Sequence, residues 1–122
     1  MTCKITSNQN ALVTGAGRRI GRAIAMSLAA AEWHVGVHYF HSSDNAETVV
    51  DEIQSLGGRA VAIGTDLGAV GASSELIAVA VEQMGPLTCL VNNASVFEQD
   101  TVATATRATW DEHMNVNLRA PF

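Results

Sequence analysis

A glycine-rich turn near the start of the chain has the residue types and spacing of a phosphate-binding loop. Residues 14–21 read T-G-A-G-R-R-I-G, directly after an apolar run at residues 11–13 and before an apolar-periodic stretch. A strand that enters a helix through such a turn presents free N–H groups and the positive end of the helix dipole, which favour a phosphate. We expect Gly15 to adopt a positive φ, Gly17 to let a ligand approach the backbone and Gly21 to let the helix pack closely on the sheet. A tight turn without a ligand is the alternative interpretation.

The end of the second expected strand indicates which nucleotide the turn would bind. Domains that bind NAD usually carry an acid there, which accepts hydrogen bonds from the ribose 2′-OH. In this chain Tyr39 holds that place, Phe40, His41 and Ser42 follow, and the next acid is Asp44. We therefore expect no carboxylate that would repel a 2′-phosphate.

Arg18 and Arg19 lie in the turn and supply positive charge for such a phosphate. A guanidinium group can bind a phosphate through two parallel hydrogen bonds. Ser42 can donate a hydroxyl hydrogen bond, and His41 can add a partial cation. We expect NADP(H) rather than NAD(H) as the cofactor. The alternative is that both arginines are solvated turn charges and that His41 has no role.

Hydrophobic periodicity predicts an alternation of strands and helices. The expected strands are residues 10–14, 35–39, 60–63 and 88–91. Ser43 or Asp44 is expected to cap the second helix, and a glycine pair or Gly-Pro to end the second and third. The four helices have predicted apolar faces at Ile20, Ala23, Ile24, Leu28 and Ala31; at Ala46, Val49, Val50, Ile53 and Leu56; at Leu76, Ile77, Ala80, Val81 and Met84; and at Trp110, Met114, Val116 and Leu118.

This alternation predicts an α/β fold of the Rossmann type. Strands that alternate with helices form βαβ units around a parallel sheet covered on both faces. Right-handed crossovers give a doubly wound sheet with the strand order 3-2-1-4. Ligands bind such sheets beyond the carboxyl ends of the strands, where the glycine turn falls. We expect a single domain over residues 1–122.

Composition and charge exclude several other classes of protein. Of the 122 residues, 48% are hydrophobic and 16% charged, which is typical of a globular domain rather than a disordered chain. The net charge of −5 leaves no basic surplus for nucleic acid or an anionic membrane. No apolar stretch has membrane-spanning length, and the first ten residues lack the apolar core of a signal peptide, so we expect a cytoplasmic protein.

Cysteine and histidine usage predicts neither disulfides nor a metal site. Cys3 and Cys89 do not make a disulfide framework, and Cys89 is expected to be a buried, inert thiol. The four histidines show no grouping at metal-ligand spacing.

Three further motifs follow the glycine turn in order along the chain. Asp66-Leu67 ends the third expected strand, Asn92-Asn93-Ala94-Ser95 ends the fourth, and Asn115-Val116-Asn117-Leu118 lies in the last helix. Together with the turn, these motifs resemble those of the short-chain dehydrogenase/reductase family across nearly the whole chain. The second motif is similar to the family's N-N-A-G, here with Ser in the last place.

The resemblance implies a role for each motif. Asp66 and Leu67 would lie against the adenine, with a helix cap as the alternative role of Asp66. The amide of Asn92 would tie neighbouring strand loops together. Asn117, or alternatively Asn115, would support catalysis by holding a water in a proton relay. The expected cofactor contacts are Gly15, Arg18, Arg19, Ile20, Tyr39, His41, Ser42, Asp66, Leu67, Asn93, Ala94 and Ser95.

Within the family, the chain looks most similar to pteridine reductases. The turn, residues 38–42 and the run Asn93-Ala94-Ser95-Val96-Phe97 carry this likeness. It implies that Phe97 stacks on a pterin, with an ordinary apolar loop residue as the alternative. The implied reaction is hydride transfer from NADPH to a carbonyl or pterin-type small molecule.

These residues cannot form the family's proton-donating pair, a Tyr with a Lys one helical turn later. The one Tyr is Tyr39 and the one Lys is Lys4. We therefore expect the N-terminal half of a reductase, inactive alone, whose full-length form is a homo-oligomer, with a tetramer implied by the resemblance. The sheet would be cut after its fourth strand and the following helix, which would leave an exposed apolar edge at residues 89–91. A non-catalytic NADP(H)-binding module and an assembly subunit are the alternatives.

Overall fold

The computed structural model describes residues 9–122, which form one four-stranded parallel sheet. Strands β1 (Asn10–Val13), β2 (His34–Tyr39), β3 (Arg59–Gly64) and β4 (Cys89–Val91) lie in the order β3-β2-β1-β4. Strand order and direction confirm the predicted topology. The expectations for Cys3 and Lys4 lie outside the described residues.

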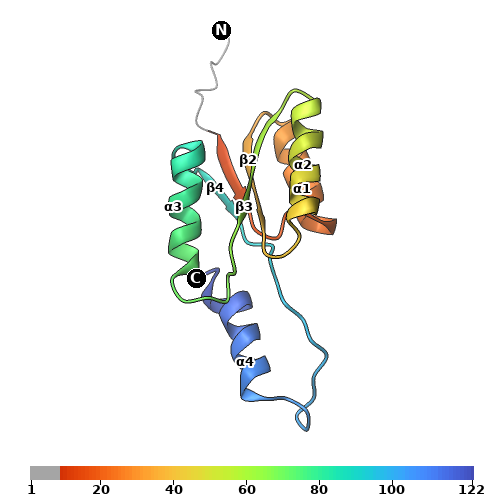
Figure 1. Cartoon of the computed structure of the whole chain (residues 1–122), viewed down its shortest axis with the longest axis vertical. Coiled ribbons are helices and arrows are strands. Elements are labelled where there is room, and N and C mark those ends of the chain that lie inside the picture. Colours follow the sequence, from red (N-terminus) through yellow and green to blue (C-terminus); the bar gives the residue numbers. More distant parts are fainter. Residues whose placement is uncertain (1–8) are drawn as a thin grey trace.

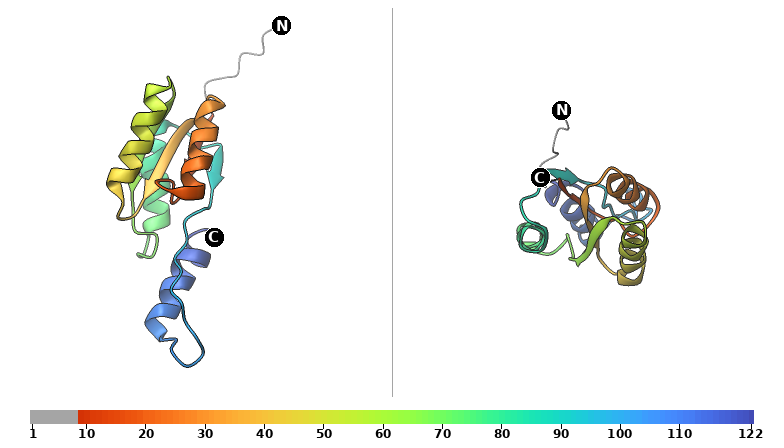
Figure 2. Two further views of the ribbon diagram at one scale, coloured as in Figure 1. Left: turned by 90° about the vertical axis from the view of Figure 1, so that its right-hand side faces the viewer. Right: turned by 90° about the horizontal axis from the view of Figure 1, so that it is seen from above.

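Helices cover both faces of this sheet. The helices α1 (Arg19–Ala30) and α2 (Ser43–Ser55) lie on one face, and α3 (Ala72–Met84) lies on the other (Figure 1). A fourth helix, α4 (Arg107–Met114), continues into a turn of π-helix, η1 (Asn115–Arg119). The loop before α4 and the helix itself extend beyond the carboxyl ends of the strands (Figure 2). Among residues 9–122, no helix is both long enough and apolar enough to cross a bilayer.

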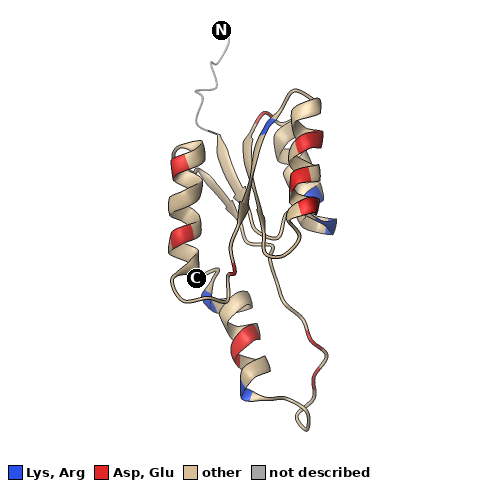
Figure 3. Cartoon of the chain, viewed as in Figure 1, with Lys and Arg blue, Asp and Glu red and all other residues tan. Residues whose placement is uncertain are grey.

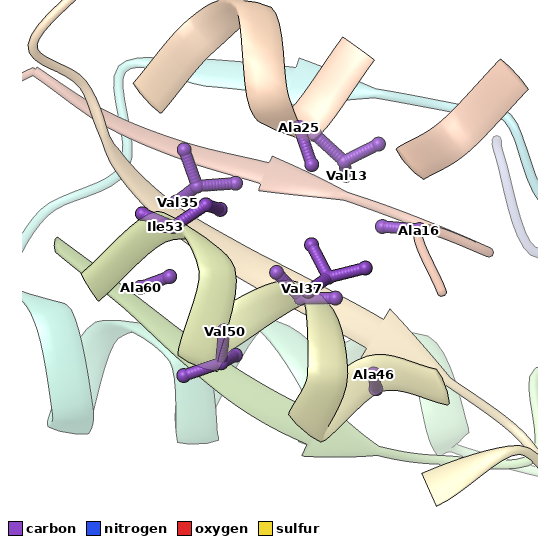
Figure 4. Packing of buried hydrophobic residues seen from close by; sticks show 10 residues of the cluster. Val13, Ala16, Ala25, Val35, Val37, Ala46, Val50, Ile53 and Ala60 are labelled. Atoms are coloured by element: carbon purple, nitrogen blue, oxygen red, sulfur yellow. The ribbon is translucent and has the colours of Figure 1, made fainter. Parts of the chain in front are cut away.

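The main core lies between the sheet and the pair α1–α2 (Figure 4). Val13, Val35 and Val37 of the two central strands are fully buried there, in one cluster with Ala25 of α1 and Ile53 of α2. A smaller cluster on the α3 side contains Leu12, Ile63, Leu76 and Ala80. Central strands that are buried on both faces are typical of a parallel sheet between two helix layers.

Several residues predicted for the buried helix faces lie on the surface instead. Ile20 and Leu56 are 70% and 78% exposed, because one lies in the first turn of α1 and the other follows the last turn of α2. The residues of α1 that are buried are Gly21 and Ala25, so this helix approaches the sheet through small side chains. Ala23, Ala31, Ile77, Val81, Trp110, Met114 and Leu118 are likewise exposed.

Two smaller expectations are also wrong. The N-cap residue of α2 is Ser42, not Ser43 or Asp44, and its side chain makes no capping bond. Cys89 is half-buried rather than buried, because β4 is an edge strand that pairs with β1 alone. Its neighbour Leu90 is 46% exposed, which gives the apolar edge expected at residues 89–91.

The glycine turn folds tightly against the start of α1. Gly15 has φ +61°, as predicted for a tight turn. A Cβ on Gly21 would lie 2.2 Å from the Gly15 carbonyl oxygen and 2.5 Å from Nδ2 of Asn93. These contacts are with backbone and with an anchored side chain, so a methyl group has no space there.

A buried histidine holds the turn to the neighbouring strand ends. His38 is 2% exposed, and its Nδ1 accepts a hydrogen bond of 3.0 Å from the Gly15 N–H. Its Nε2 lies 2.9 Å from the Thr65 carbonyl oxygen, which can only accept, so the proton is on Nε2 and the ring is neutral. Burial lowers the pKa of His38, against a smaller opposing effect of the bond to Thr65.

The variant Gly21→Ala is expected to lose about 1–3 kcal/mol of unfolding free energy, because the added methyl group overpacks the turn. Urea unfolding of the variant and the wild type measures this loss. Ser27→Ala, on the exposed side of α1, is the control and should change stability by less than about 0.5 kcal/mol. Equal stability of Gly21→Ala and the wild type would contradict the close packing.

The unfolding free energy should fall as the pH drops below 6.5, the ordinary pKa of histidine. The unfolded chain then takes up a proton that the buried His38 ring resists, so stability is complete above this pH and is lost below it. Urea unfolding between about pH 8 and pH 5 measures the slope. His38→Gln, whose amide can also accept and donate, should make it shallower.

His34 also has a lowered pKa, from partial burial and then from the charge of Arg59, so His34→Gln is the matched comparison. If His34→Gln alone removed the pH dependence, His38 would not be the titrating group.

Candidate functional site

A cleft of about 770 Å³ lies at the carboxyl ends of the strands. Its walls are the glycine turn, the ends of β2 and β3, the segment after β4, and α4 with η1. Every residue predicted to contact a cofactor lines this one cleft: Gly15, Arg18, Arg19, Ile20, Tyr39, His41, Ser42, Asp66, Leu67, Asn93, Ala94 and Ser95.

The start of α1 gives one end of the cleft the character of an anion site. The N–H groups of Gly15 and Ala16 are used by His38, and the first helical bond runs from the Arg22 N–H to the Arg18 carbonyl. The N–H groups that come just before Arg22 therefore have no carbonyl partner in their own helix. They point along the helix axis with the positive end of its dipole, where an anion is favoured.

Arg18 and Arg19 line the cleft, and within residues 9–122 neither guanidinium forms an ion pair. Arg22, one turn later, instead pairs with Glu52 on α2. Figure 3 shows basic positions at the start of α1. Within residues 9–122 these two guanidinium groups thus have no carboxylate in direct contact, while Asp66, Asp111 and Glu112 line other parts of the cleft. This arrangement suits a ligand with more than one phosphate group.

Arg19 has φ +50°, which the sequence did not predict. Residues other than glycine adopt such angles rarely, at a cost of order 1–3 kcal/mol, and mainly at functional sites. Arg18 beside it is extended, with φ −147° and ψ 160°. The backbone therefore turns sharply between the two guanidinium groups.

Asn93, rather than Asn92 as expected, ties the strand loops together. Its Nδ2 donates to the carbonyl oxygens of Thr14 and Gly15, both at 3.0 Å. The Thr14 hydroxyl accepts from the N–H groups of Asn93 at 3.0 Å and Ala94 at 2.9 Å. Asn92 is exposed and lines a second, largely apolar cavity beside α3, which adjoins the cleft at Leu67, Ala94 and Val116.

The end of β2 presents aromatic groups to the cleft and no carboxylate. The Tyr39 ring packs over Gly64, where an added Cβ would lie 2.7 Å from it. The rings of Phe40 and His41 contact each other at a tilt of 37°, with centroids 3.6 Å apart. Asp44, the next acid, is exposed in the first turn of α2. Gly17, expected to face a ligand, also lies against the start of α2.

Asp66 does not cap a helix, so its alternative role is wrong. Its Oδ1 accepts from the Gly68 N–H at 2.9 Å, and the N-cap residue of α3 is Gly71. The Asp66 carboxylate thus closes a local turn on the wall of the cleft.

The two residues predicted for catalysis and substrate lie beside the cleft rather than on its lining. Asn117 Oδ1 accepts from the Val96 N–H at 2.8 Å, and its Nδ2 donates to the Val96 carbonyl at 2.9 Å. Asn115, the alternative, does line the cleft. Phe97 is 84% exposed, next to Val96 on the wall.

Sequence reasoning missed part of the lining. His38 lies near the end of a strand pattern, and its burial beside polar partners gives no periodic signal. The α4 residues Ala108, Asp111 and Glu112 also line the cleft, because the chain returns to it after a long loop. Among residues 9–122, no group of three or more potential ligands is placed to hold a metal ion.

The chain is similar to a known family model and to several reductases. The family model described as short chain dehydrogenase matches residues 9–122. The 3-oxoacyl-(acyl-carrier-protein) reductase FabG of Staphylococcus epidermidis is 38% identical over 115 residues, which cover 94% of this chain and 47% of the relative. Versicolorin reductase of Emericella nidulans is 42% identical over 112 residues, which cover 92% and 42%.

Solved structures give the same result. FolM alternative dihydrofolate reductase 1 from Brucella canis, complexed with NADP, superposes with a TM-score of 0.88 and 38% identity, over 94% of this chain and 46% of that one. A blue fluorescent protein from a metagenomic library, in complex with NADPH, has a TM-score of 0.88 and 34% identity, over 93% and 47%. The chain spans about half the length of these relatives. Since the family model matches nearly all of its residues, the chain belongs to the short-chain dehydrogenase family.

Proposed function

We propose that residues 1–122 form the cofactor-binding portion of an NADPH-dependent reductase that transfers hydride to a carbonyl or pterin-type small molecule. One observation carries the proposal: two unpaired arginines share a cleft with a helix N-terminus and with a strand end that has no carboxylate. The related structures from Brucella canis and from a metagenomic library contain NADP and NADPH, which supports the same cofactor here.

In this proposal, each wall of the cleft holds one part of the cofactor. The first turn of α1 binds the diphosphate, while Arg18, Arg19 and the loop after β2 bind the 2′-phosphate. Asp66 and Leu67 contact the adenine, and the segment Asn93-Ala94-Ser95 faces the nicotinamide ribose. The bound nicotinamide supplies the hydride.

We place the proton-donating pair outside these residues. Tyr39 packs over Gly64 at the proposed adenosine end of the cleft, and β1 separates its strand from the proposed nicotinamide wall at β4. The relatives are about twice as long, so the proposed Tyr and Lys belong to the part of the full-length protein that matches their other half. Asn117 would hold a water in the proton relay, and Phe97 would be the platform for the substrate.

We further propose that the full-length protein is a cytoplasmic homo-oligomer, and specifically a tetramer. Trp110 of α4 and Leu118 of η1 are large apolar residues that are 61% and 64% exposed. Exposed large apolar side chains of this kind are expected at a contact that an assembly covers. The alternative, a module that binds NADP(H) without turnover, is favoured only by the lack of a Tyr/Lys pair in these residues.

The double variant Arg18→Ala/Arg19→Ala should weaken NADPH binding by at least about tenfold more than NADH binding. Hydrogen bonds from a guanidinium to a phosphate contribute roughly 1.5–3 kcal/mol each, and NADH has no 2′-phosphate. Fluorescence titration with each nucleotide measures the ratio.

Arg59→Ala is the matched control, because it removes an exposed guanidinium at the opposite end of the sheet. It should leave both affinities unchanged. An equal loss of NADPH and NADH binding in the double variant would refute the assignment of the arginines.

Reductase activity is testable in the full-length protein. Consumption of NADPH should require an added ketone or oxidised pterin, and a panel of both separates the two substrate classes. Saturable NADPH binding without turnover of any panel member would favour the non-catalytic alternative.

A further inference from the structure

The loop between β4 and α4 is ordered by a ladder of hydrogen bonds along one side of the helix. Residues 92–105 contain no helix or strand, yet they run beside α4 before turning back into it (Figure 2). Loops of this length in compact domains usually carry a function. The ladder has three rungs, at Val96, Glu98 and Asp100.

The first rung is the Asn117 amide, which holds both backbone groups of Val96. In the second, the Glu98 N–H donates to His113 Nε2 at 3.0 Å. In the third, the Thr109 hydroxyl donates to Asp100 Oδ2 at 3.0 Å. From one rung to the next, the loop residue is thus two positions later in the chain and the helix residue four positions earlier.

This register follows from the geometry of the two chains. Two residues of extended chain span about 6.6 Å, and four residues of α-helix rise by about 6 Å. Each step of two along the loop therefore meets the next turn of the helix. This relation holds between Thr109 and His113 of α4, whereas Asn117 of the first rung lies in the π-helical turn η1.

His113 can form its rung only in one protonation state. Its Nδ1 lies 2.6 Å from the Thr109 carbonyl oxygen, which can only accept, so Nδ1 carries the proton. In this neutral ring Nε2 carries no proton, so it can accept the hydrogen bond from the Glu98 N–H. Asp100 fixes the far end, where hydrogen bonds, led by that from Thr104, lower the pKa of its carboxyl group.

Phe97 lies between the first two rungs. Its own ring is 84% exposed, so side-chain packing does little to fix its direction. The backbone on both sides of it is held instead, by Asn117 through Val96 and by His113 through Glu98. The orientation of the ring thus depends on these two helix side chains.

We propose that His113 is a positioning residue for the substrate, which acts by fixing the backbone of Phe97 through Glu98. The inference rests on the proposed function only in that Phe97 faces the substrate. The hydrogen bond itself can be tested without any cofactor or substrate.

Two variants that replace His113 with an amide side chain distinguish its hydrogen bond to Glu98 from its hydrogen bond to Thr109. In His113→Asn the short side chain can still donate to the Thr109 carbonyl but does not reach Glu98. In His113→Gln the longer side chain reaches Glu98, and its oxygen can accept from that N–H. His34→Asn, on β2, is the control histidine.

Amide hydrogen exchange of Glu98, followed by NMR, is the first measurement. Exchange should be about tenfold faster in His113→Asn, as for the loss of one hydrogen bond, and should return toward the wild-type rate in His113→Gln. In the wild type, nitrogen NMR at neutral pH should show the Nδ1–H tautomer of His113. Unchanged exchange in His113→Asn, or the other tautomer, would overturn the proposal.

Kinetics of the full-length reductase are the second measurement. His113→Asn should raise the KM for substrate several-fold, with a smaller change in kcat, while NADPH binding stays within about twofold of the wild type. His113→Gln should recover the KM. If exchange responds but KM does not, the bond does not position substrate and the proposal fails. If the wild type does not bind NADPH, it is the proposed function that fails, while the exchange result still decides the hydrogen bond.

Discussion

The site depends on the close contact between the glycine turn and the segment after β4. Asn93 donates to two successive carbonyls of the turn, and Thr14 accepts from two successive N–H groups of that segment. These four bonds satisfy polar groups where two strands end together and neither strand continues. They also bring Gly21 so near to the Gly15 carbonyl that no side chain fits between them. The first turn of α1 is thereby fixed over the carboxyl end of β1.

His38 extends this contact to the other side of the sheet. The ring joins the Gly15 N–H to the Thr65 carbonyl, so that the turn is held from β4 and from the end of β3. Because the two bonds need one donor and one acceptor, a neutral histidine fits and a charged one does not. The same side chain therefore supports both the core and the wall of the cleft. Buried polar groups of this kind define a single arrangement only when every partner is present.

The cleft combines a rigid wall with a less anchored one. The turn, β2 and β3 belong to the buried core, whereas α4 has no buried residue of its own and lies beyond the sheet. The placement of α4 relies on Val116, which is buried, and on its ladder to residues 96–100. We infer that cofactor binding is set by the first wall and substrate placement by the second. Phosphate recognition needs fixed N–H groups, while a substrate wall can differ among family members that share a sheet.

The sequence by itself determined the sheet and the chemistry of its end. The hydrophobic pattern alternates between strands and helices, and this alternation predicts the strand order because right-handed crossovers leave few other arrangements. The glycine spacing and the missing acid after Tyr39 are local features, and the residues chosen from them line one cleft with the residues after β3 and β4 that the family resemblance indicated. Helix faces were less well predicted, since α1 packs through Gly21 and Ala25 and leaves Ile20 exposed.

Only the tertiary structure decided which polar side chains meet. Asn93 and Asn92 are adjacent and chemically identical, so no local pattern could tell which of them reaches Thr14. The burial of His38, the positive φ of Arg19 and the pairing of Glu98 with His113 likewise depend on residues distant in the chain. Periodicity reports which face of an element is apolar, whereas a hydrogen bond depends on the position of both partners. That position is fixed only when the helices have packed on the sheet.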